Sequence, residues 1–193
     1  MVIRLALDVN VWVNHYLSLF RGRTGSAAQQ LVASSINGSC RLGEIQPIIS
    51  HLMLDTLQGV LVREGIPEDL AEVARSNVEA AATDGVVGMS PIAVLGGRVA
   101  PVMDEEDQAV LEMAIAGGAD LLVTSNMRDF IPGPRSDIPT DEIRHGRDGS
   151  PDVLIIRHAN LSHGLVIASV PAARAWLVNG ITPPGGLLER FLP

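Results

Sequence analysis

Short apolar runs alternate with longer helical segments along this chain, and that alternation restricts the fold more than any other feature. Residues 3–7 (IRLAL) form an apolar run that stops at Asp8, and a helical pattern follows directly over residues 9–20. Residues 103–116 form a second helical pattern, and the apolar run 119–124 (ADLLVT) comes next. This order predicts an α/β fold, a three-layer α/β/α sandwich with a central parallel sheet.

The rest of the chain continues the pattern. Helices are expected at residues 24–36, 50–63, 68–82 and 172–178, and strands at 45–49, 90–94, 153–156 and 165–169. Pro47 suggests that its strand lies at an edge or breaks early. Residues 131–151 hold four prolines and many charges, which is typical of a surface loop. We therefore expect one domain over 1–193, with a loop insertion at 131–164.

Composition narrows the function classes. The net charge is −8, and all 14 basic residues are arginines against 22 acidic residues, so a passive nucleic-acid binder is disfavoured. A nuclease that holds cations with carboxylates remains open, because bound metal reverses the local charge. The single cysteine, Cys40, excludes an internal disulfide and fits a cytoplasmic protein. No apolar run reaches transmembrane length, so no membrane association is expected.

Three groups of polar residues follow or precede the predicted strands. Asp8 ends the first strand, where it could simply cap the next helix. The run 104–107 (DEED) could also serve as a cap, yet four consecutive acids exceed what capping requires. Asp107 shares a helix face with Leu111 and Ala114, so it should point inward. Residues 124–126 (TSN) end the second strand, and Asp129 follows shortly after.

The carboxyl ends of parallel strands are where α/β sheets bind ligands. Carboxylates brought together there repel one another, and a divalent cation resolves that repulsion. Mg²⁺ prefers oxygen ligands, usually a few carboxylates with water and substrate phosphate. Such a cation makes a water molecule nucleophilic at neutral pH. The acids thus predict a Mg²⁺ or Mn²⁺ site.

Two strings of residues resemble the PIN-domain family. LALDVNVWV resembles its first motif, and DEEDQAVLEMAIAGGADLLVTSNMRDF resembles its later block. The resemblance spans roughly residues 1–130 and is strongest to the branch that includes VapC-type toxins. Residues 165–178 would complete the core. The resemblance implies a metal-dependent endoribonuclease fold with an acidic site.

The resemblance also assigns roles to residues. Asp8 and Asp107 take the positions of two metal-binding acids, and Asp104 matches a further acid of this branch. The family's second acid, usually Glu, falls at Asp55 or Thr56. Its fourth acid falls at Asn126, where the charge is lost unless Asp129 compensates. Catalysis is thus expected from Asp8, Asp55, Asp104, Asp107 and Asn126, with metal held by Asp8, Asp107 and Asp104.

The leading hypothesis is an endoribonuclease toxin with an RNA substrate, a small antitoxin partner and a homodimeric state, all implied by the resemblance. The alternative is a catalytically weak or inactive PIN-like module that binds RNA or a protein. A third possibility is a phosphotransfer enzyme of the haloacid dehalogenase type. That family needs a second Asp where Asn10 stands, which disfavours it.

Overall fold

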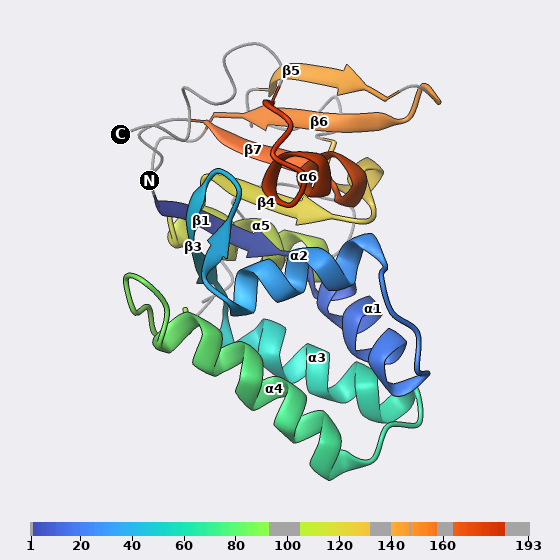
Figure 1. The fold of residues 1–193 in the computed structure, drawn as a ribbon. Helices are drawn as coiled ribbons and strands as arrows, with labels where there is room; N and C mark the ends of the chain where they lie inside the picture. Colours follow the sequence, from blue (N-terminus) through green and yellow to red (C-terminus); the bar gives the residue numbers. More distant parts are fainter. Residues whose placement is uncertain (1, 93–104, 132–139, 147, 158–163, 184–193) are drawn as a thin grey trace.

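The computed structural model describes residues 2–92, 105–131, 140–146, 148–157 and 164–183. Within them, seven strands form one sheet in the order β2-β3-β1-β4-β7-β6-β5 (Figure 1). The central strands β3, β1, β4 and β7 are parallel, whereas β2, β6 and β5 pair antiparallel to their neighbours. The strands are β1 (Val2–Leu7), β2 (Ser39–Cys40), β3 (Gly43–Ile48), β4 (Leu121–Thr124), β5 (Thr140–His145), β6 (Pro151–Ile156) and β7 (Leu165–Ser169).

Helices cover the sheet. In Figure 1, α2 and α6 lie in front of it and α5 lies behind it, while α3 and α4 form an antiparallel pair that extends beyond β3 and packs against α1. This is the predicted sandwich of helix, sheet and helix. The helices are α1 (Val9–Phe20), α2 (Ala27–Ile36), α3 (His51–Arg63), α4 (Glu68–Thr83), α5 (Glu105–Ala116) and α6 (Val170–Leu177), with a short 3-10 helix η1 (Met127–Phe130) after β4.

Side-chain caps set where several helices begin. Ser26 and Gln29 form a capping box at α2, in which each side chain accepts a hydrogen bond from the other's backbone N–H. The Ser50 hydroxyl accepts from Met53 N at 3.1 Å and starts α3. Ser169 caps α6 in the same way, and Pro171 fits the first turn because that turn needs no N–H donor there. Ser50 and Ser169 stand where the chain leaves β3 and β7 for a helix, whereas Ser26 starts the second of two consecutive helices.

The buried residues explain why the central strands are parallel. Leu5, Ala6 and Leu7 of β1 are at most 1% exposed, and the four residues of β4 are fully buried. Strands without a polar face must be covered on both sides, which only helices on both faces provide. β1 lies between β3 and β4, with Leu5 in register with both Pro47 and Leu121. β1 is therefore an interior strand of the sheet.

Gln46 protects the side of β3 that faces away from β1. In the described residues, β2 pairs only with Gly43 and Glu44, so this side of β3 has no neighbouring strand at Pro47, as expected for a proline. The buried Gln46 amide nitrogen donates to the carbonyls of Pro47 and Ala82 at 3.0 and 2.9 Å. Its side-chain oxygen accepts from the backbone N–H groups of residues 87 and 88. One side chain thereby fastens the end of α4 to the sheet.

Three expectations need correction. The loop expected at 131–151, within the insertion at 131–164, contains strand β5, which forms an antiparallel hairpin with β6. The strand expected at 90–94 is only a bridge between Ile92 and Ser50, and residues 93 and 94 lie outside the described part. The helix expected at residues 24–36 begins only at Ala27, after the cap at Ser26. None of the described helices is both long and apolar enough to span a membrane.

Candidate active site

Asp8 stands at the carboxyl end of β1 and is held by three neighbouring groups. Its backbone N–H donates to Val123 O at 2.9 Å, which continues the pairing of β1 with β4. The Thr124 hydroxyl donates to Asp8 Oδ2 at 2.7 Å, and the Asn10 backbone N–H donates to Oδ1 at 3.3 Å. The Asp8 carboxylate therefore caps α1, the simpler of the roles expected for it, and it also contacts the end of β4 through Thr124.

Burial dominates the electrostatics of Asp8. The residue is 1% exposed, and this burial raises the pKa of its carboxyl above the ordinary value, although the hydrogen bond from Thr124 opposes the rise. None of the described arginines forms an ion pair with Asp8. A buried carboxyl in this state favours a proton or a cation close by.

Thr124 connects Asp8 with the loop after β4. It is the last residue of β4 and is fully buried. Its Oγ1 donates to Asp8 and accepts from Asn126 N at 2.9 Å. Thr124 is a site residue that the sequence assignment did not include. The signal was its place at the end of a buried strand.

A pocket of about 240 Å³ opens beside Asp8, between the first turns of α1, α3 and α5. Val9, Ser50, Leu52, Met53, Thr56, Glu106, Ala109 and Val110 line it. Of the acids in the 104–107 run whose side chains the structure describes, Glu106 lines this pocket. The sequence treated it only as a member of that run.

The second acid of the predicted site is where the structure departs most from expectation. Asp55 points away from the pocket: its side chain is 67% exposed and its carboxylate lies 3.4 Å from the Arg75 guanidinium on α4. Thr56 lines the pocket in its place. Of the two residues expected for the family's second acid position, Thr56 lines this pocket and Asp55 does not.

Asp107 points inward, as predicted. It is 9% exposed and lies on the same face of α5 as Leu111 and Ala114, which are also buried. Asp104 lies outside the described residues. Convergence of Asp8, Asp104 and Asp107 therefore stays a prediction.

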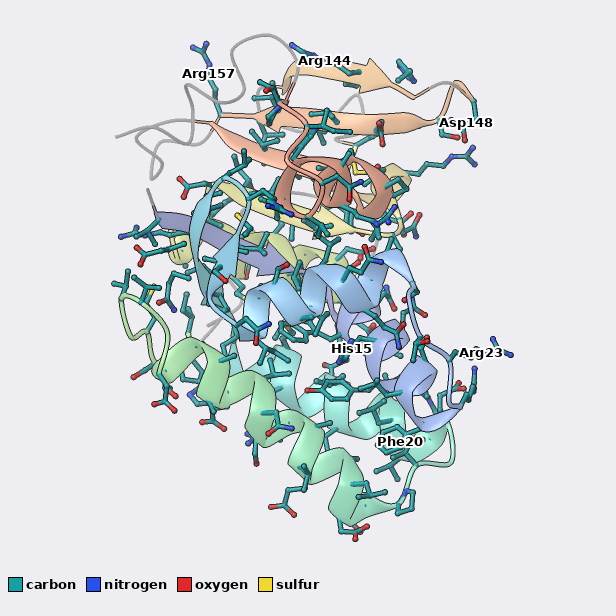
Figure 2. The ribbon with its side chains drawn as sticks, in the orientation of Figure 1. His15, Phe20, Arg23, Arg144, Asp148 and Arg157 are labelled. Carbon is teal, nitrogen blue, oxygen red and sulfur yellow. The ribbon has the colours of Figure 1, made fainter. Side chains whose placement is uncertain are left out.

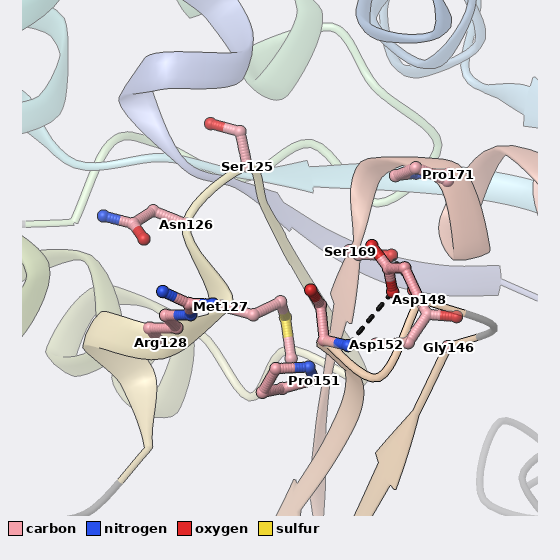
Figure 3. A pocket seen from close by; sticks show the side chains of 11 residues that line it. Ser125, Asn126, Met127, Arg128, Gly146, Asp148, Pro151, Asp152, Ser169 and Pro171 are labelled. Carbon is pink, nitrogen blue, oxygen red and sulfur yellow. Dashed lines mark hydrogen bonds between the residues drawn. The ribbon is translucent and has the colours of Figure 1, made fainter.

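Asn126 lines a second and larger cleft. This cleft has a volume of about 560 Å³ and lies between the loop after β4 and the turn from β5 to β6 (Figure 3). The Asn126 side-chain amide donates to the carboxylate of Asp129. Asp129 is thus a partner of Asn126, so the two side chains form one polar unit next to Thr124.

The fit to a divalent cation depends on few groups. Among the described residues, no cluster of three or more His, Cys, Asp or Glu side chains could hold a metal. Asp8 offers a buried carboxylate that none of the described arginines pairs with, and Asp107 offers a second buried carboxylate. Asp120 is also buried, but it accepts from Arg4 N at 2.8 Å and so serves the opposite end of β1. Carboxylates are the ligands that a hard divalent cation prefers, with water in several of the remaining positions.

Comparison with known proteins gives one match. The sequence model described as the PIN domain matches residues 4–128, which include Asp8, Thr56, Asp107 and Asn126. No curated protein and no solved structure matches the chain. The match ends before the β5–β6 hairpin.

Proposed function

Because the chain belongs to the PIN-domain family, a family of nucleases, we propose that it is a Mg²⁺- or Mn²⁺-dependent endoribonuclease. One observation carries the proposal: a buried Asp8 carboxylate, oriented by Thr124, at the carboxyl edge of the parallel sheet. Structural caps have no need of such burial. A carboxyl that is costly to ionise is typical of a site that works with a cation.

Asp8 and Asp107 are the residues that would hold the cation, with Asp104 as the third acid implied by the family resemblance. When bound, the cation would supply positive charge for the scissile phosphate and acidify the attacking water. The chain's own contribution is orientation. Thr124 and the Asn10 N–H fix the Asp8 carboxylate before any ligand arrives, so the acid does not have to be reorganised during the reaction.

We also propose the biological setting that the VapC-type resemblance implies: an RNA substrate, a small antitoxin, a homodimer and a cytoplasmic location. Large apolar side chains support a protein partner. Leu19 and Phe20 at the end of α1, and Leu70 and Val73 on α4, are each at least 39% exposed. Figure 2 shows Phe20 at the end of the molecule away from the β5–β6 hairpin. Such side chains favour contact with another protein over solvent.

The direct test is cleavage of single-stranded RNA by the purified chain with Mn²⁺, with EDTA as the metal-free control. Asp8→Asn and Asp107→Asn should abolish cleavage while the protein stays folded. Asp55→Asn is the matched control, because the same chemical change then falls on an exposed ion pair outside the pocket. Cleavage that persists in EDTA contradicts the metal requirement. Equal loss in the Asp55 and Asp8 variants contradicts the placement of the site.

A second candidate function is a PIN-like module with weak or no catalysis, which binds RNA or a protein. The specific observation is that the uncharged Thr56 lines the pocket from α3, where the family usually carries Glu. Millimolar Mg²⁺ or Mn²⁺ should raise the thermal stability of a metal-binding enzyme, because a ligand that binds only the folded state stabilises it. No such rise would favour the binding module.

Asn126→Asp tests how much charge the site lacks. In the metal-free protein the substitution replaces a hydrogen bond to Asp129 with repulsion between two carboxylates, so stability should fall. With Mn²⁺ the added charge should increase both metal affinity and cleavage rate. If metal affinity is unchanged and Asp129→Asn removes it, then Asp129 is the ligand and Asn126 is not central.

A further inference from the structure

We infer that the cleft between the loop after β4 and the β5–β6 turn is a nucleobase subsite that selects guanine beside the scissile phosphate. This inference rests on the proposed ribonuclease function for its position relative to the phosphate. Guanine binding itself can be measured without any cleavage.

The dimensions and lining of the cleft suit a nucleotide. Its volume of about 560 Å³ falls in the range of small-molecule sites. Met127, Pro151 and Pro171 give apolar surface against which a base can lie, and polar side chains complete the walls. In Figure 3, Asn126 and Arg128 stand on one side, and Asp148 and Ser169 stand across from them.

The cleft begins at Ser125, one residue after the Thr124 that holds the candidate catalytic acid Asp8. Ser125 and Asn126 line it, and they follow Thr124, whose hydroxyl holds Asp8. A nucleotide with its phosphate near Asp8 could therefore place its base here. The opposite wall lies beyond the end of the family match at residue 128, and it consists of Gly146, Asp148, Ser150, Pro151 and Asp152. This wall is thus a feature of this chain and not of the matched core.

Two carboxylates on that wall are fixed in position. Asp148 lies at the tip of the hairpin (Figure 2), and its Oδ1 accepts from Ser150 N at 3.0 Å. Asp152 accepts from the Ser169 hydroxyl, which also caps α6. The hydrogen bond from the Ser150 N–H, and to a smaller extent the charge of Arg128, lower the pKa of Asp148. Both groups act as acceptors that are oriented before a ligand arrives.

Carboxylate acceptors discriminate between bases. Guanine presents two adjacent donors, N1–H and the N2 amino group, which one carboxylate can accept together. Uracil presents one N–H flanked by two carbonyl oxygens, which a carboxylate repels. Reading of an exposed base edge in this way is how proteins recognise single-stranded RNA. Arg128 on the facing wall is suited to a phosphate oxygen, because guanidinium groups bind phosphates through paired N–H donors.

The test is a titration of the whole chain with 5′-GMP, AMP, CMP and UMP in EDTA, followed by NMR or calorimetry. GMP should bind about fivefold or more tightly than UMP, as expected for one good bidentate contact. Asp148→Asn and Asp152→Asn should reduce that preference. Asn can still accept from Ser150 N, so the Asp148 variant keeps its turn. Asp69→Asn, an exposed acid on α4 far from the cleft in sequence, is the matched control.

Equal binding of all four nucleotides, or a GMP preference that survives both variants, would overturn the subsite. A cleavage assay with Mn²⁺ on RNAs that differ at a single base separates this failure from failure of the proposed function. Cleavage without base preference, together with no GMP binding, leaves the nuclease and removes the subsite. Guanine binding that depends on Asp148 and Asp152, with no cleavage, supports the subsite and removes the nuclease.

Discussion

Thr124→Val removes the hydroxyl that orients Asp8 while it keeps the shape of a fully buried side chain. Two hydrogen bonds are lost. The bond to the Asp8 carboxylate contributes about 1.5–3 kcal/mol when its acceptor is charged, and the bond from the Asn126 N–H contributes about 0.5–1.5 kcal/mol. The free energy of unfolding at neutral pH should therefore fall by about 2–4 kcal/mol.

Thr124→Ser is the matched control. It keeps the hydroxyl and deletes one buried methyl group, which costs about 0.5–1.5 kcal/mol. The free energy of unfolding of the Thr124→Val variant should therefore be lower than that of the Thr124→Ser variant by about 1–3 kcal/mol. For a chain of this size, 1 kcal/mol corresponds to about 2–4 °C in Tm.

The assay is urea or thermal unfolding in EDTA, followed by the fluorescence of the buried Trp12 and Trp176. The difference in unfolding free energy between the Thr124→Val and Thr124→Ser variants should narrow in acid. Asp8 is protonated there, so the lost bond no longer has a charged acceptor. It should also narrow when both substitutions are made in the Asp8→Asn background. A Val variant as stable as the Ser variant at neutral pH would refute the claim that Thr124 supports a charged Asp8.

Three further predictions follow from named contacts. Burial raises the pKa of Asp8, so the folded state holds a proton that the unfolded chain has lost; stability should decline as pH rises from the unfolded pKa through the folded one. Asp8→Asn should remove this decline and stabilise the metal-free protein at neutral pH, as a urea titration across pH will show. Gln46→Leu should cost about 2–4 kcal/mol in chemical denaturation, because it deprives four backbone groups of their partner. Gly117→Ala should lower the free energy of unfolding by about 1–3 kcal/mol in the same measurement, because a Cβ there would lie 2.3 Å from Ile48 Cγ2. Gly118→Ala would not serve as its control, because Gly118 has a φ of +61° and any side chain there is strained.

The central elements could be predicted because buried strands and helices are apolar in the sequence itself. Residues 3–7 and 121–124 are mostly apolar, and Asp8 and Ser50 cap the helices that follow them. Sequence and structure therefore agree at β1, β4, α1 and α3. β5 has no such apolar run in its sequence. Its sequence TDEIRH is mostly polar, since it lies at the edge of the sheet and is specified by its pairing with β6.

The register at Asp55 and Thr56 could not be decided from the sequence for a different reason. Neighbouring residues on a helix point about 100° apart, and the apolar spacing of α3 allows either to face the site. The packing of α3 in the folded protein decides it: Asp55 lies exposed beside Arg75 of α4, and Thr56 lines the pocket. In the same way, the amide of Asn126 bonds to Asp129 through a turn whose geometry no motif specifies.

The separation of Asp8 and Thr124 along the chain has a consequence for folding. The bond between them joins residues 116 positions apart, and β1 meets β4 only after the first 124 residues are available. During synthesis β1 can pair with β3 at once, but its other side waits for the later strand. Contacts between distant segments form slowly, because the intervening chain must be ordered first. The candidate catalytic centre is therefore among the last parts of the core to assemble, and a nascent or truncated chain lacks it.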